Sequence, residues 1–260
     1  MKLGFFDSGM GGLSVLHHAM KILPREEFIF FADEDNVPYG TKTPEEVLGF
    51  VDEAFKFLTA QGVGAIVVAC NTATSVAVGA MREKYSLPII GMEPALKLAL
   101  DTFPNRKVLV TATAITITGK KIRRLIKTLH AEDLAELRAL PRLVEFAERQ
   151  EFKSAAVEGY LRGELSAYDW KKFSSMVLGC THFNYFKDTL REILPPHVKI
   201  LDGNAGTVNE LIRRTHLQPA RAESVPPTKF FYSGRRVTDA AELARLETFL
   251  KRLDDMETIE

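Results

Sequence analysis

Short apolar runs recur along the chain, and amphipathic stretches separate them. The runs cover residues 3–6, 28–31, 65–68, 88–90, 107–111, 176–178, 199–201 and 229–232. Each run suits one buried strand, and strands that alternate with helices are typical of βα units around mostly parallel sheets. The pattern therefore predicts an α/β fold.

The most clearly bounded helix begins after Gly40. Thr43 can cap its first turn, Pro44 suits its first position, and Glu46 completes a capping box. Gly62 can end the helix. These signals predict both ends of the helix.

Two turn-rich segments indicate where the chain changes direction. Residues 101–105, which include Pro104, are polar enough to cross between two lobes, and residues 202–206 are rich in turn-forming residues. A chain of 260 residues with 46% hydrophobic residues can also form two compact units. We therefore expect boundaries near these segments.

The expected first lobe is discontinuous. It comprises residues 1–92 with residues 206–260, and residues 93–205 form the second lobe. A last helix, around residues 239–252, is expected to pack on the first lobe. Each lobe should hold a mostly parallel sheet flanked by helices.

One local pattern occurs twice. Residues 65–72 and 175–182 each contain a strand-like run, a small residue, a cysteine and then polar residues. Cys70 and Cys180 should thus lie at the C-terminal ends of two strands. Ligands bind at that edge of open α/β sheets, so both thiols are candidates for chemistry.

Cys70 on its own could be a buried structural residue, because free cysteine is among the most buried residue types. Asn71 and Thr72 follow it directly, which predicts a strand-to-helix turn. The free N–H groups of the helix would favour a thiolate there. The context therefore favours a functional thiol.

Cys180 is followed by Thr181 and His182, so its setting repeats the first one and adds a possible proton-relay partner. A lone histidine is more often structural, but one beside a cysteine is a catalytic candidate. Neither cysteine has the paired spacing of a zinc site. We predict no metal.

A glycine-rich turn, from Asp7 to Gly12, follows the first apolar run. It lacks the GxGxxG spacing of a nucleotide site, whereas its backbone N–H groups could hold a carboxylate. A tight βα turn would explain the glycines nearly as well. Asp7 favours function, because a carboxylate at a strand tip can orient a thiol or an ammonium group.

The composition excludes several partner classes. Lys and Arg number 34, as do Asp and Glu, so no nucleic acid or membrane partner is expected. No apolar run reaches membrane-spanning length, and no signal-peptide pattern follows Met1. Two cysteines make no disulfide framework, which favours a cytoplasmic protein with reduced thiols.

Five motifs together resemble the glutamate racemases of the aspartate/glutamate racemase superfamily. In chain order they are Asp7–Gly12, Val37–Gly40, Ala69–Thr72, Met92–Pro94 and Leu178–Phe183. Each motif alone is weak, but five in the family order over nearly the whole chain are specific. The resemblance implies two similar lobes, an active site in the cleft between them, and a possible homodimer.

The resemblance also implies roles for individual residues. Cys70 and Cys180 take the places of the catalytic thiols, one from each lobe, with Asp7 and His182 beside them. Glu145 matches a supporting position. The positions that hold the ammonium and carboxylate groups of the substrate are matched by Asp7, Ser8, Tyr39, Gly40, Asn71, Thr72, Thr116, Thr181 and His182.

Three positions depart from the family pattern. Ala32 replaces a frequent glycine, Asn36 replaces a frequent arginine, and Asn184 replaces a frequent proline. None of these changes affects a thiol, so the chemistry is expected to be intact. Side-chain specificity and regulation are left open.

Two thiols suit the inversion of an α-carbon, because one group must remove a proton from one face while another returns a proton to the other face. The reference pKa of a thiol, about 8.5, allows both thiol and thiolate near neutral pH. No lysine lies in the cysteine motifs, so a pyridoxal phosphate design is unsupported. We expect cofactor-independent interconversion of L- and D-glutamate, which by resemblance supplies D-glutamate for peptidoglycan.

Other functions are compatible with parts of this pattern. An aspartate racemase or a broad-specificity relative would use the same chemistry. A decarboxylase or isomerase of the superfamily would often lack one cysteine, and a non-enzymatic amino-acid sensor would not need the pair. The oligomeric state and any regulator stay open.

Overall fold

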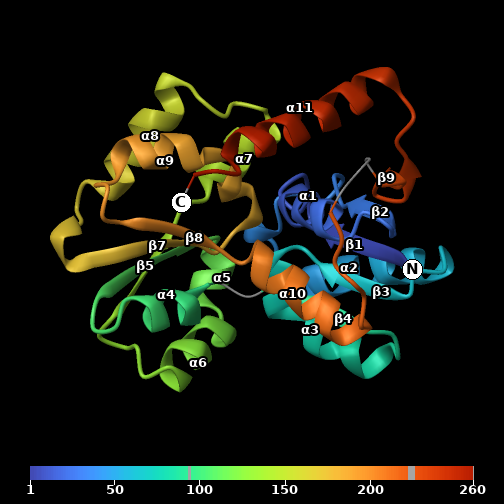
Figure 1. Cartoon of the computed structure of the whole chain (residues 1–260), viewed down its shortest axis with the longest axis horizontal. Coiled ribbons are helices and arrows are strands. Elements are labelled where there is room, and N and C mark those ends of the chain that lie inside the picture. Colours follow the sequence, from blue (N-terminus) through green and yellow to red (C-terminus); the bar gives the residue numbers. More distant parts are fainter. Residues whose placement is uncertain (93–94, 222–225, 260) are drawn as a thin grey trace.

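The computed structural model describes residues 1–92, 95–221 and 226–259 (Figure 1). Its strands are β1 (Lys2–Asp7), β2 (Glu27–Ala32), β3 (Ala65–Val68), β4 (Ile89–Gly91), β5 (Lys107–Ala112), β6 (Ala135–Ala139), β7 (Phe173–Leu178), β8 (Lys199–Asp202), β9 (Thr228–Tyr232) and β10 (Arg235–Arg236). The α-helices are α1 (Leu13–Ile22), α2 (Pro44–Ala60), α3 (Asn71–Lys84), α4 (Leu96–Thr102), α5 (Ala114–Thr118), α6 (Lys120–Thr128), α7 (Arg142–Glu148), α8 (Ala155–Leu165), α9 (Lys187–Ile193), α10 (Asn204–Thr215) and α11 (Ala240–Met256). The 3-10 helices within the described residues are η1 (Tyr39–Thr41), η2 (Trp170–Lys172) and η3 (Thr181–Phe186).

The first sheet has the strand order β10-β9-β2-β1-β3-β4. All its pairs are parallel except β10 with β9. β1 lies between β2 and β3, where Phe6 pairs with both Phe31 and Val68. The register places Asp7 at the C-terminal end of β1, near the residues that follow β3.

The second sheet has the order β6-β5-β7-β8 and is parallel throughout. β7 is an inner strand with six buried residues, and it ends two residues before Cys180. The expected α/β class and the two lobes with mostly parallel sheets are confirmed. Figure 1 shows the two sheets side by side, each with helices packed around it.

Two strands do not follow an apolar run. β6 alternates polar and apolar residues and is only partly buried at the edge of its sheet. β10 consists of two exposed arginines at the edge of the other sheet. Edge strands need no continuous apolar run, because one side of the strand faces solvent.

The capping signals of α2 are confirmed. The backbone N–H of Glu46 donates to Thr43 Oγ1 at 3.2 Å, and the N–H of Thr43 donates to Glu46 Oε2 at 2.8 Å. Pro44 occupies the first turn, and Gly62 adopts a φ of 71° just after the helix. None of the helices in the described residues is long and apolar enough to span a bilayer.

Residues 101–105 do not form the crossing between the sheets, contrary to expectation. α4 precedes them, and its buried Leu96 and Ala99 share a cluster with Val108 and Val177 of the second sheet. The chain has therefore reached the second sheet before residue 101. The segment is polar because it forms the exposed end of α4 and the turn into β5, and not because it crosses between the sheets.

The lobe boundaries at residues 92/93 and 205/206 stay predictions. They are compatible with the sheets, since β5 to β8 all come from residues 93–205. Glu93 and Pro94, in the motif that begins at Met92, lie outside the described residues.

α11 packs against both halves rather than on the first alone, so this expectation was wrong in part. It contacts α1 beside the first sheet and η3 beside the second. The ring of Phe249 lies 5.1 Å from the ring of Tyr185 in η3. Figure 1 shows α11 spanning the two halves, and the buried residues of the helix include Leu246, Phe249 and Leu253.

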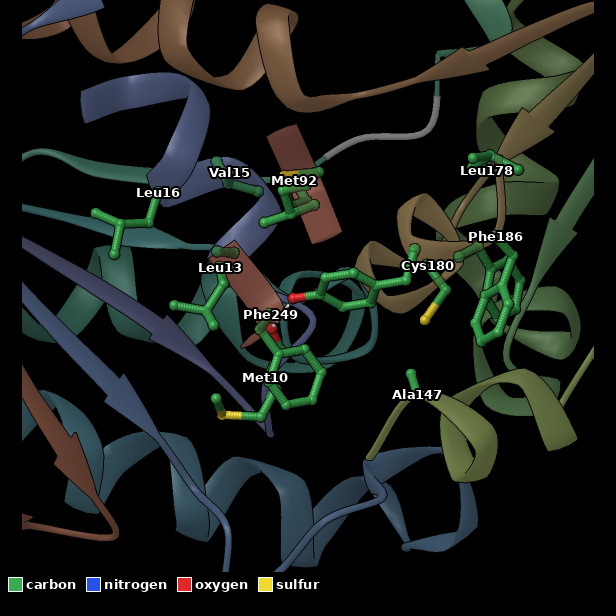
Figure 2. Close-up of a cluster of buried hydrophobic side chains, with 14 of the residues drawn as sticks. Met10, Leu13, Val15, Leu16, Met92, Ala147, Leu178, Cys180, Phe186 and Phe249 are labelled. Atoms are coloured by element: carbon green, nitrogen blue, oxygen red, sulfur yellow. Dashed lines mark hydrogen bonds between the residues drawn. The ribbon is translucent and has the colours of Figure 1, made fainter. Parts of the chain in front are cut away.

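The largest cluster of buried side chains also joins the halves (Figure 2). Met10 and Leu13 enter it from the turn and helix after β1. Leu178 and Cys180 enter it from β7 and the residues after it. This continuous core fixes the position of one sheet relative to the other, including the C-terminal edges that the cysteines follow.

Candidate active site

One pocket lies between the C-terminal edges of the two sheets, and both cysteines line it. Its cavity volume is about 50 Å³. The lining residues are Asp7, Ser8, Pro38, Tyr39, Gly40, Thr41, Cys70, Asn71, Thr72, Thr113, Ala114, Pro141, Val144, Glu145, Cys180, Thr181 and His182. The structure thus gathers every predicted site residue except Thr116 around one cavity.

Cys70 lies at the N-cap of α3, directly after β3. The backbone N–H of Ala73 donates to its Sγ at 3.4 Å, and the thiol donates to Ser8 Oγ at 3.7 Å. Burial and the charge of Asp7 nevertheless raise the pKa of Cys70 well above its ordinary value. The bond from the Ala73 N–H lowers the pKa, as expected at a helix N-terminus, but burial and the charge of Asp7 outweigh it.

Asp7 is fully buried at the end of β1. The N–H of Gly12 donates to its Oδ2 at 2.6 Å, while Oδ1 has no hydrogen-bond partner in the described part of the chain. Burial raises the pKa of Asp7 to about 6, against the lowering effect of the His182 charge. An orphaned carboxylate oxygen beside Cys70 can accept a proton or a hydrogen bond from substrate.

Cys180 has a different setting at the N-cap of η3. Its Sγ lies 3.8 Å from His182 Nδ1, and no backbone N–H caps it. The two cysteines thus share a position at a strand end but not their partners. Cys70 faces a carboxylate and a hydroxyl, and Cys180 faces an imidazole.

His182 is buried, and Glu148 lies behind its ring. His182 Nε2 is 2.6 Å from Glu148 Oε1 and 3.2 Å from the backbone nitrogen of Gly11. Nε2 cannot donate to Glu148 and accept from Gly11 together, and the shorter, charge-assisted contact is the stronger. Burial lowers the pKa of His182, but its bonds to Cys180 and Glu148 outweigh burial and raise the pKa well above the ordinary value. The contacts of the ring therefore favour its protonated form.

Glu148 was missed by the sequence analysis. Glu145, which was chosen in the same segment, lines the pocket but is exposed, whereas Glu148 lies one turn further along α7 and contacts His182. Helical spacing puts both residues on one face, which was the available signal. Burial raises the pKa of Glu148, but the bond and charge of His182, the N–H of Met10 and the charge of Arg245 together outweigh burial and lower it.

Tyr39 and Gly40 form part of the pocket wall on the side of the first sheet. The Tyr39 hydroxyl donates to Asp33 Oδ2 at 2.6 Å. Asp33, which the sequence analysis did not select, also accepts from Asn36 Nδ2 and from Ser233 Oγ at 2.8 Å. Asn36 therefore helps to hold the carboxylate that orients Tyr39.

A group of threonine hydroxyls lies next to Gly40, where an added Cβ would be 3.1 Å from Thr113 Cβ. Thr72 Oγ1 lies 2.9 Å from Thr113 Oγ1, and Thr113 Oγ1 donates to Thr116 Oγ1 at 3.0 Å. Thr113 reaches the pocket, whereas Thr116 is buried behind it. Asn71 also lines the pocket, and its Nδ2 has no hydrogen-bond partner among the described residues.

The other predicted positions have simpler surroundings. Asn184 is buried, and its Nδ2 donates to the carbonyl of Thr181 at 3.1 Å. Ala32 is buried at the end of β2. Among the described residues, no group of three or more His, Cys, Asp or Glu side chains is placed to hold a metal ion.

The pocket presents two thiols, from different sheets, to a molecule bound between them. Asp7 Oδ1 can accept a hydrogen bond from an ammonium group, and Asn71 Nδ2 can donate one to a carboxylate. The arrangement can therefore bind a small zwitterion and exchange protons with it from two sides.

The sequence matches the model of the Asp/Glu/Hydantoin racemase family over residues 13–211. It is 52% identical to a glutamate racemase of Campylobacter concisus, with 100% of both chains covered. It is 40% identical to glutamate racemase 2 of Bacillus subtilis, covering 98% of this chain and 97% of the other.

Solved structures agree with these sequence matches. A Francisella tularensis glutamate racemase in complex with D-glutamate has a TM-score of 0.79 at 28% identity, covering 96% of this chain and 93% of the other. The Escherichia coli glutamate racemase, in complex with L-glutamate and an activator, has a TM-score of 0.78 at 27% identity, covering 95% and 94%.

Proposed function

Because this chain belongs to the Asp/Glu/Hydantoin racemase family, we propose that it interconverts L- and D-glutamate by acid–base chemistry at two thiols, without a cofactor. One observation carries the proposal: Cys70 and Cys180 line the same pocket from different sheets. The names of relatives such as the Campylobacter concisus protein support glutamate as the substrate.

In the proposed reaction, a thiolate removes the α-proton from one face of glutamate, and the resulting carbanion takes a proton from the other thiol. Cys70 acts as the base toward D-glutamate and Cys180 toward L-glutamate. Each turnover moves one proton onto one sulfur and one proton off the other, so the reverse reaction restores both. No external oxidant or metal enters the balance.

Each thiol has its own assisting groups. Asp7 and Ser8 lie beside Cys70, where they can take and orient its proton. His182, as an imidazolium held by Glu148, can stabilise the Cys180 thiolate. Both thiols are buried, and electrostatic interactions with the carbanion are stronger there than in bulk water.

The substrate is held by the groups that stay unpaired in the pocket. Asp7 Oδ1 and Asn71 Nδ2 suit the ammonium and a carboxylate of glutamate. Ser8, Thr72, Thr181 and the backbone near Gly40 supply further polar groups around it. Glu145, at the pocket rim, is a supporting residue in this proposal.

The test follows the optical signal of purified protein with L-glutamate, D-glutamate and L-aspartate, with a metal chelator and no added cofactor. Both glutamate enantiomers should reach a racemic mixture. A faster change with aspartate would favour an aspartate or broad-specificity racemase, and tight binding without any change would favour a sensor.

Deuterated water separates two-base from one-base chemistry. Early product should carry solvent deuterium at the α-carbon while unreacted substrate keeps its proton, because the thiol that donates is not the one that accepts. Replacing either cysteine with alanine should abolish racemisation in both directions. Near wild-type racemisation by one of these variants would contradict the mechanism.

The biological setting is part of the proposal. Supply of D-glutamate for peptidoglycan in the cytoplasm is supported by the bacterial origin of the relatives. A homodimer stays a prediction. A deletion strain that grows only with added D-glutamate would support the role, and one that external D-glutamate does not rescue would argue against it.

A further inference from the structure

One side chain of the C-terminal helix connects the two halves of the molecule through carboxylates. Arg245 of α11 donates from Nη1 to Glu34 Oε2 at 2.7 Å and from Nη2 to Glu148 Oε2 at 2.8 Å. Glu34 follows β2 of the first sheet, and Glu148 ends α7 beside the second. The guanidinium therefore bridges the two halves.

Both oxygens of Glu148 are engaged, and they have different partners. Oε1 contacts His182 Nε2 at 2.6 Å and accepts from the N–H of Met10 at 2.9 Å. Oε2 is left for Arg245. Arg245 thus holds the side of the carboxylate that faces away from His182, which limits rotation of the Glu148 side chain.

Aromatic rings help to hold the Arg245 guanidinium in its position between the two carboxylates. Its guanidinium lies 5.7 Å from the ring centre of Tyr232 and 5.5 Å from that of Phe249. Without it, two half-buried carboxylates would face each other. Burial and the charge of Glu148 raise the pKa of Glu34 to about 7, and the charge and hydrogen bond of Arg245 oppose this rise.

We propose that Arg245 is a positioning residue for the Cys180 half of the reaction: it holds Glu148 in place for His182 and makes α11 part of the proton-transfer apparatus. The kinetic part of this inference rests on the proposed glutamate racemisation. The geometric part concerns His182 alone and can be tested without turnover.

The test compares Arg245→Met with Arg252→Met. Arg252 is a matched control, because it lies two turns further along α11 and donates to Asp188 at 2.6 Å and to the Tyr185 carbonyl at 2.9 Å. Its side chain is 12% exposed, against 23% for Arg245. Both variants lose one charged anchor of α11, but only Arg245 touches Glu148.

The first readout is the titration of the His182 imidazole, followed by nuclear magnetic resonance in the full-length protein. In Arg245→Met, Glu148 Oε2 loses the guanidinium that holds it, so the carboxylate can turn away from His182, and the pKa of His182 should fall because burial then dominates. If Arg245 acted only as a nearby cation, its loss would raise the pKa of His182. Either a rise or no change would overturn the inference.

The second readout is the primary isotope effect with α-deuterated substrates. The equilibrium constant between enantiomers is unity, so kcat/KM must fall equally in both directions, by about 10- to 100-fold. The isotope effect should rise for the enantiomer that Cys180 deprotonates and fall for the other. Equal changes for both enantiomers would contradict a role in the Cys180 half.

Arg245→Lys provides a second variant if the methionine variant folds poorly. A lysine keeps the charge but cannot span both carboxylates as a guanidinium does, so partial recovery of the His182 pKa and of kcat/KM is expected. If Arg252→Met changed the His182 pKa and kcat/KM as much as Arg245→Met does, Arg245 would have only a structural role. If no variant racemises glutamate, the His182 titration still decides the geometric claim.

Discussion

At the residue scale, the molecule places one residue type in two electrostatic settings. Cys70 lies beside the carboxylate of Asp7, and Cys180 lies beside the imidazole of His182. The glycine-rich turn makes both settings possible, because it passes close to Asp7 and to His182. A Cβ on Gly12 would lie 2.5 Å from Asp7 Cβ, and one on Gly11 would lie 2.3 Å from His182 Nδ1.

Replacing Gly11 with alanine should therefore displace the His182 ring. The new Cβ would also lie 2.7 Å from the backbone nitrogen of His182, so a side-chain rotation alone cannot relieve the clash. We expect kcat/KM for glutamate racemisation to fall about 100-fold, as for other small misplacements of catalytic groups. Steady-state kinetics with both enantiomers measures this.

Gly79→Ala is the control for that substitution. Gly79 lies in α3 with open space where its Cβ would point. The variant should be more stable by about 0.5–1 kcal/mol, with unchanged kinetics, because alanine is the better helix former. Full activity in Gly11→Ala would show that the contact with His182 is not needed.

At the element scale, local signals determine where the helices begin, and tertiary contacts determine what they pack against. α2 begins at a capping box, as its sequence predicts. α11 is capped by Asp239, whose carboxylate accepts from the N–H groups of Ala241 and Glu242, but its packing on both halves depends on distant residues.

Thr43→Ala should destabilise the protein by about 1 kcal/mol, because the first turn of α2 loses its cap. Thr248→Ala is the control. Thr248 is exposed within α11 and its hydroxyl bonds only the Ala244 carbonyl, so alanine should be neutral or slightly stabilising. Urea unfolding measures both. Equal stability of the two variants would mean that the capping box contributes nothing.

At the scale of the whole molecule, the site is maintained at a cost to stability. Burial raises the pKa of Asp7 to about 6 and that of Glu34 to about 7. A carboxyl with a raised pKa contributes stability below its unfolded pKa and loses that contribution as pH rises through the folded value. Between about pH 4 and 7, both groups therefore make the fold less stable as pH increases.

Asp7→Asn should remove the part of this cost that Asp7 causes. An amide can still accept from the Gly12 N–H, and it carries no charge to bury. We expect the variant to be more stable than the parent at pH 8, by about 1–3 kcal/mol, and equal to it near pH 4. Denaturant unfolding at the two pH values measures the difference.

The same variant should lose most of its racemase activity, because Asp7 can no longer accept a proton near Cys70. In the parent, kcat/KM should fall below about pH 6 as Asp7 becomes protonated. A stability gain that persists unchanged at pH 4 would show that burial of the charge is not its source.

The sequence by itself determined the features that depend on neighbouring residues. The apolar runs predicted the inner strands, the capping box predicted α2, and the repeated pattern predicted that Cys70 and Cys180 lie at strand ends. These features follow from backbone hydrogen bonding, side-chain period and turn chemistry over a few positions.

The tertiary structure decided the features that depend on contacts between distant residues. Folding decides which faces meet. It therefore decides that Glu148 rather than Glu145 contacts His182, and that Thr113 rather than Thr116 lines the pocket. It also decides that α11 packs on both halves. The protonation of Cys70 likewise depends on burial, which outweighs its position at a helix N-terminus. Burial and long-range contact arise only when the two sheets pack together, so a local pattern such as the helical spacing of Glu145 and Glu148 offers candidates but cannot choose between them.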